Sequence, residues 1–186
     1  LPYDPSAIFY PDFFSASEAD QLLTQITETT SWEEQTLTLF GKQVREPRLS
    51  AWVSDGISYT YSRSTRHPAP WTPVLDDIRQ RCESITSTQF NSVLANLYRD
   101  GQDHMGWHAD DERSIVPNSC IASISLGATR NFDFKHRKTG EKVRIPLLPG
   151  SLLSMEGETQ QHWLHALPKA LKIQSPRVNL TFRQMV

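Results

Sequence analysis

The second half of the chain consists of short, strand-like segments that follow one another between turn residues. Seven such segments are predicted after Phe90, at residues 91–98, 120–127, 130–136, 142–148, 150–155, 162–167 and 177–183. Residues 137–141 have the composition of a hairpin turn, and Pro149-Gly150 interrupts the chain again. Many short strands in series predict an antiparallel sandwich or barrel.

Two helices are predicted before these strands. Ser15 and Glu18 have the spacing of a capping box, and apolar residues follow at helical intervals. A second helix is predicted from Trp71-Thr72-Pro73 through Ile85, with Pro at an early position. We therefore predict an α+β fold, in which a jelly-roll core (a double-stranded β-helix) carries the N-terminal helices on its outside.

The composition excludes several classes of protein. Hydrophobic residues make up 38% of the 186 residues and charged residues 22%, which is typical of one folded domain. The net charge of −2 argues against a protein that coats nucleic acid nonspecifically. No apolar run could span a bilayer, and the N-terminus does not resemble a secretory signal. With only Cys82 and Cys120 present, we expect reduced thiols and an intracellular protein, cytoplasmic in a bacterium or nuclear in a eukaryote.

The last predicted strand has two chemically different faces. Residues two apart on a strand point to the same side, so one face carries Val178, Leu180 and Phe182. The other face carries Arg177, Asn179, Thr181 and Arg183. We expect the apolar face to meet the outer helices and the polar face to point into the barrel. Buried guanidinium groups require anionic partners, and arginine suits a carboxylate particularly well.

The strand at 91–98 has polar residues that could join this group. Asn96 and Tyr98 share one face with Leu94. Core strands rarely direct an amide and a phenol inward without partners. Together with Thr181 and Arg183, these side chains could hold a small dicarboxylate.

His108 and Asp110 are candidate metal ligands. Two imidazoles and one carboxylate on one side of a metal suit non-haem Fe(II), because three coordination positions stay open. His-x-Asp alone is a common pattern, and it needs a second histidine from elsewhere in the chain. The candidates are His104, which we expect in the same loop, and His162 and His165, which would face opposite sides of one strand. The residues alone do not choose among them.

Four motifs together resemble the AlkB family of Fe(II)/2-oxoglutarate dioxygenases, in particular the branch that contains AlkB homologues 2 and 3. The motifs are Asn96-Leu-Tyr98-Arg-Asp-Gly, His104-x-Gly-x-His108-x-Asp110-Asp111-Glu112, His165-x-Leu-Pro and Arg177-Val-Asn-Leu-Thr-Phe-Arg183. The resemblance extends from about Phe40 to the C-terminus. Each motif is weak alone, and the combination is highly specific.

The resemblance implies roles for these residues. His165 would be the third iron ligand, so that His108, Asp110 and His165 form the catalytic centre. Arg183 would pair with the distal carboxylate of 2-oxoglutarate. The other predicted co-substrate residues are Asn96, Tyr98, Arg177, Asn179 and Thr181. Fe(II), 2-oxoglutarate and O₂ would together oxidise an N-methyl group, with release of succinate, CO₂ and formaldehyde.

The resemblance also implies a pocket for a flipped or single-stranded base. It places nucleotide-recognition hairpins at about residues 32–70, before a catalytic core at about residues 90–186. Tyr61 would stack on the base, and Tyr59 would donate a hydrogen bond, in a segment that includes Ser62. Asp111 and Glu112 would meet an exocyclic amine or the positive charge of a methylated base. A solvated acidic loop is the alternative for those two residues.

Phe40 lies in Thr36–Lys42, which reads as a hairpin ending in Phe-Gly. An apolar wedge can fill the gap that a flipped base leaves, so an exposed Phe40 favours duplex DNA as the substrate. A place in the core is the alternative for this side chain.

The sequence thus predicts a monomeric enzyme that demethylates 1-methyladenine and 3-methylcytosine in DNA, with no contact to a membrane. The sequence does not distinguish this enzyme from an RNA demethylase that uses the same chemistry. A zinc hydrolase would use a similar ligand set, but it needs no dicarboxylate clamp. A metal-free module that binds nucleic acid is the third alternative.

Overall fold

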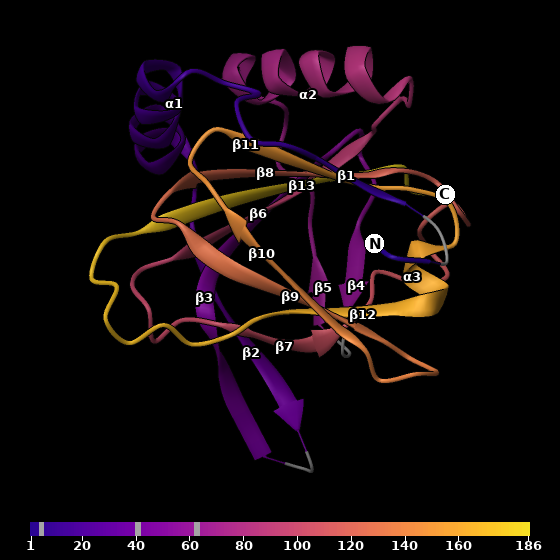
Figure 1. Ribbon diagram of the computed structural model, residues 1–186. Coiled ribbons are helices and arrows are strands. Elements are labelled where there is room, and N and C mark those ends of the chain that lie inside the picture. The colour runs from indigo at the N-terminus through magenta and orange to yellow at the C-terminus, as the bar shows by residue number, and fades with distance from the viewer. Residues whose placement is uncertain (4–5, 40–41, 62–63) are drawn as a thin grey trace.

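The structure, a computed structural model, describes residues 1–3, 6–39, 42–61 and 64–186, and at 37–39, 42, 59–61 and 64–66 it describes the backbone alone. Phe40 and Ser62 therefore lie outside the described residues. The described chain forms three layers, in which two helices cover a large sheet and a smaller sheet lies on the opposite side (Figure 1).

The large sheet has seven strands among the described residues, in the order β1-β11-β8-β13-β6-β3-β2, and each neighbouring pair is antiparallel. The strands are β1 (Ala7–Tyr10), β2 (Glu33–Leu39), β3 (Lys42–Ser54), β6 (Ser92–Tyr98), β8 (Ile121–Gly127), β11 (Ser151–Met155) and β13 (Arg177–Arg183). The β2–β3 hairpin extends well beyond the body of the molecule (Figure 1).

The small sheet has the order β10-β9-β12-β7 in the described part of the chain. Its strands are β7 (Met105–His108), β9 (Arg130–His136), β10 (Lys142–Leu147) and β12 (Trp163–Leu167). A separate hairpin pairs β4 (Tyr59–Tyr61) with β5 (Ser64–Arg66). Two facing antiparallel sheets form the predicted double-stranded β-helix, so the predicted fold class is confirmed.

The two predicted helices are present and pack outside the large sheet. Helix α1 (Ala16–Thr29) begins with a complete capping box between Ser15 and Glu18. Helix α2 (Pro73–Thr86) begins at the cap Thr72, with Pro in its first turn. Their apolar faces share one core with the outer face of the large sheet. Both helices are too short to cross a lipid bilayer, as is any other helix in the described ranges.

The region around the histidines differs from the prediction. His162 ends a short helix, α3 (Thr159–His162), and only His165 lies on β12. The prediction of one strand carrying both histidines was therefore wrong. Residues 105–108 form β7, where a loop was expected, and β1 was not predicted. Elements of four residues are too short for hydrophobic periodicity to reveal them.

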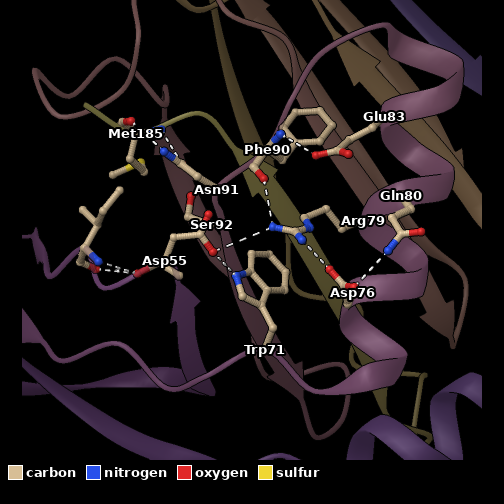
Figure 2. A network of polar contacts seen from close by, with 12 residues as sticks. Asp55, Trp71, Asp76, Arg79, Gln80, Glu83, Phe90, Asn91, Ser92 and Met185 are labelled. Atoms are coloured by element: carbon tan, nitrogen blue, oxygen red, sulfur yellow. Dashed lines mark hydrogen bonds and ion pairs between the residues drawn. The ribbon is translucent and has the colours of Figure 1, made fainter.

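A polar network joins the start of α2 to the ends of β3 and β6 (Figure 2). The Trp71 indole N–H donates to Asp55 at 2.6 Å, and the Arg79 guanidinium lies 4.3 Å from the Trp71 ring centroid. Arg79 also pairs with Asp76 and donates to the Phe90 carbonyl at 3.4 Å. The Trp71 ring in turn stacks on Phe182 of β13, 6.4 Å away. The network therefore fastens α2 to the strand that carries the two arginines.

We expect Arg79→Ala to lower the free energy of unfolding by about 1–2 kcal/mol, because it removes an ion pair, a bond to a carbonyl and a cation–π contact. Chemical denaturation would measure the change. Arg45→Ala is the matched control, because its ion pair with Glu34 is on the surface and Arg45 is 77% exposed. Equal losses in the two variants would contradict the role given to the network.

Candidate active site

His108, Asp110 and His165 converge at one end of the small sheet. His108 on β7 and His165 on β12 are direct cross-strand partners, and Asp110 follows β7 by two residues. One possible ligand atom from each residue lies within 4.8 Å of the others. The two Nε2 atoms are 3.1 Å apart. Adjacent ligands at right angles, each about 2.1 Å from a metal, are separated by roughly 3 Å, so the pair fits one ion.

The surroundings of the two imidazoles fix their orientation. His108 Nδ1 lies 2.9 Å from the Gly106 carbonyl, which makes Nδ1 the protonated nitrogen and leaves the Nε2 lone pair for a metal. His165 is 4% exposed, and its ring stacks on Phe132 at 5.3 Å. His104 Nδ1 lies near the Gln102 carbonyl instead, outside the triad.

Burial and neighbouring charges set the protonation of the triad. Burial alone would raise the pKa of Asp110, but Arg183 and the two histidines outweigh it and hold that pKa at about 2. Burial, followed by the neighbouring His108, lowers the pKa of His165 to about 3. At neutral pH the carboxylate is therefore charged and the His165 imidazole neutral, which are the forms that bind metals.

The polar face of β13 lines a cavity that begins at the triad. Asn179 donates to Ser123 at 2.8 Å and to the Ile124 carbonyl at 2.9 Å, while Thr181 donates to Asn179 at 3.1 Å. Other lining residues are Arg48, Leu94, Asn96, Tyr98, Glu112, Phe132, Met155, Arg177 and Arg183. The apolar face of β13 is fully buried against the helices, as the alternation predicted.

The two arginines are the first and last residues of β13, and both line this cavity. Arg183 Nη2 lies 2.9 Å from the Asp110 carboxylate, beside the candidate metal position. Arg177 donates to Ser125 at 2.9 Å and lies 5.3 Å from the Tyr98 ring centroid. Its Nε is buried, with no hydrogen-bond partner among the described residues. Arg183 therefore lies beside the triad, while Arg177 lies farther along the same strand.

The residues predicted to contact the base differ in where the structure places them relative to the cavity. Glu112 lines the cavity. Asp111 forms an ion pair with Arg137 at 2.6 Å, and its side chain is 51% exposed. Tyr59 and Tyr61 lie on β4, in a segment whose side chains are outside the described part.

Sequence reasoning missed three residues that support the site. The buried side chain of Gln160, in α3, accepts the backbone N–H of Asp110 at 3.0 Å. Arg48 and Glu46 form a buried pair on β3, next to Asn96. No local pattern marks these residues, because the contacts of Gln160 with Asp110 and of Arg48 with Asn96 join segments that lie far apart in the chain.

Two facing sheets that carry two histidines and a carboxylate define the class of non-haem iron oxygenases. Residues 6–183 match the family model described as the 2OG-Fe(II) oxygenase superfamily. The chain belongs to that superfamily, and its iron and 2-oxoglutarate follow from the membership and the triad. It is therefore a dioxygenase that uses 2-oxoglutarate.

The similar proteins include two kinds of human enzyme. The chain is 42% identical to human DNA oxidative demethylase ALKBH2, over 95% of this chain and 72% of that protein. It is 43% identical to human alpha-ketoglutarate-dependent dioxygenase alkB homolog 3, over 94% and 64% respectively. The solved structure of OsALKBH1 has a TM-score of 0.70 at 15% identity, covering 99% of this chain and all of that one. At that identity the likeness concerns the fold alone.

We expect Gln160→Leu to weaken Fe(II) binding about tenfold, because it removes the acceptor that holds the Asp110 backbone. Metal titration without oxygen would measure the affinity. Gln161→Leu is the matched control, since the Gln161 amide contacts Asn118 on the surface. Unchanged iron affinity in a folded Gln160→Leu variant would show that this contact does not position the ligand.

Proposed function

We propose that the protein removes N-methyl groups from 1-methyladenine and 3-methylcytosine in DNA by oxidation, with duplex DNA as the substrate. The observation that carries the proposal is one cavity with a two-histidine, one-carboxylate triad at its end and two buried arginines along its wall. Relatives at about 42% identity bear the description of DNA oxidative demethylases. Such a substrate would place the protein in the cytoplasm of a bacterium or the nucleus of a eukaryote.

In this proposal His108, Asp110 and His165 hold Fe(II), with Asp110 as a charged carboxylate and His165 as a neutral imidazole. When bound, the iron, 2-oxoglutarate and O₂ supply the oxidation of the methyl group, which leaves as formaldehyde. The protein contributes a fixed ligand geometry and a cavity lined by residues of both sheets. The buried walls exclude water from the reacting groups.

The positions of the arginines support a division of the co-substrate contacts. Arg183 is already bound to Asp110, so it would neutralise charge at the metal end of the pocket. Arg177 has a buried donor available and lies farther along β13. Arg177 would therefore take the distal carboxylate, with Asn96, Tyr98, Asn179 and Thr181 lining the space between.

The base would enter from the side of the hairpins. A base inside a duplex cannot reach a buried metal, so it must be flipped or single-stranded. Glu112, which lines the cavity, is the better placed of the two acids to meet a cationic methylated base. Asp111 would act at the rim, together with its partner Arg137. Tyr59, Tyr61 and Ser62 are proposed to complete the base pocket.

We expect Asp110→Ala to abolish the formation of both succinate and formaldehyde, because it removes the one carboxylate of the triad. Both products would be measured with Fe(II), 2-oxoglutarate and a methylated oligonucleotide present together. Omission of any one component from the wild-type reaction should give the same result. Retained turnover in Asp110→Ala would overturn the metal assignment. Faster turnover of methylated RNA than of DNA would redirect the proposal to RNA.

We expect Phe40→Ala to reduce demethylation of a duplex about tenfold and to leave a single-stranded oligonucleotide within twofold, because only a duplex leaves a gap to fill. The initial rates on the two substrates would be compared at equal concentrations. Lys42→Ala, beyond the tip of the same hairpin, controls for a general loss of charge or contact. Equal losses on the two substrates would rule out the wedge.

A further inference from the structure

A buried ion pair on β3 lies beside the co-substrate cavity. Arg48 Nη2 is 2.9 Å from Glu46 Oε2, and the two side chains are 6% and 1% exposed. Arg48 also lines the cavity, and its Nε donates to Asn96 Oδ1 at 3.0 Å. Buried ion pairs contribute little net stability compared with apolar residues of similar volume. Their position beside a ligand pocket therefore points to a role in the pocket.

The register of the large sheet explains why the three side chains meet. Ser50 on β3 is directly opposite Asn96 on β6, so Arg48, two residues earlier, is a diagonal neighbour on the same face. Asn96 is in turn directly opposite Asn179 of β13. Contacts of polar side chains thus run from Glu46 through Arg48 to Asn96, and Asn96 lies on β6, the strand next to the one that carries the two arginines. Figure 1 shows β3, β6 and β13 in the large sheet.

Arg48 determines which end of the Asn96 amide faces the cavity. A guanidinium group has five N–H donors and no acceptor. The Asn96 atom that it contacts must therefore be the carbonyl oxygen. With that oxygen held on the β3 side, the NH₂ group is the end left for a ligand. Asn96 then presents donors to the pocket, which is what a carboxylate or keto oxygen requires.

We propose that Arg48, held by Glu46, is a positioning residue that orients the Asn96 amide to donate to 2-oxoglutarate. This inference rests on the proposed co-substrate site. Glu46 occupies one edge of the guanidinium and balances its charge, so that the Nε edge stays directed at Asn96. Arg48 acts through Asn96 and does not itself contact the co-substrate.

The test replaces Arg48 with a residue that both donates and accepts. In Arg48→Gln the side-chain amide of Asn96 is free to rotate, so that its oxygen and nitrogen can exchange places. We therefore expect the affinity for 2-oxoglutarate to fall about tenfold. Calorimetric titration of the Mn(II)-loaded protein with 2-oxoglutarate, without oxygen or nucleic acid, measures this directly. In turnover, the KM for 2-oxoglutarate should rise while the KM for the methylated oligonucleotide stays within twofold.

Three further variants keep the test independent of folding. Arg48→Lys can only donate, so it should restore the affinity to within about threefold of the wild type. The double variant Glu46→Gln with Arg48→Gln leaves no buried unpaired charge, and it should bind as weakly as Arg48→Gln alone. Arg144→Gln, an exposed arginine on β10, is the control and should bind normally.

The outcomes separate this inference from the site on which it rests. Normal 2-oxoglutarate binding in both Arg177→Met and Asn96→Asp would show that the proposed co-substrate site is wrong. If those two variants bind weakly but folded Arg48→Gln binds normally, the positioning role is overturned. A raised KM for the oligonucleotide alone in Arg48→Gln would mean that Arg48 contacts nucleic acid instead.

Discussion

The burial of two guanidinium groups on one face of β13 is the constraint on which the rest of the molecule depends. Each charge must find a partner inside the sandwich. Asp110, just after β7, pairs with Arg183, while Ser125 of β8 and the Tyr98 ring of β6 contact Arg177. The space between the sheets therefore keeps a polar part along β13, beside a smaller apolar cluster that includes Ile121, Phe134, Leu153 and Trp163. The larger hydrophobic core lies on the opposite face of the large sheet, under α1 and α2.

Much of the fold was predictable, because β13 and the two long helices have strong local signals. Alternation gave both the strand and the direction of its two faces, and cap residues located the starts of α1 and α2. His162 was misplaced because a four-residue helix leaves no periodic signal. The strand β7 was missed for the same reason.

The site itself was only partly predictable. The sequence motifs alone left three histidines as candidates for the second imidazole ligand. In the structure, the pairing of β7 with β12 brings His165 opposite His108. The side chains of two adjacent acidic residues have different surroundings, since Glu112 lines the cavity while Asp111 forms an ion pair with Arg137. The supports from Gln160 and Arg48 depend on contacts between segments 48 or more positions apart. The register between strands decides such contacts, and it cannot be predicted from any short segment of the sequence.

The position of β7 has a consequence for the mechanical integrity of the small sheet. It is a four-residue strand at the edge of that sheet, it pairs with β12 alone among the described strands, and its ladder is interrupted by an irregularity. Such a strand frays readily. Its last residue is His108, so a metal ion bound by both His108 and His165 would also hold β7 and β12 together. Loss of iron would then loosen the rim of the pocket as well as remove the oxidant.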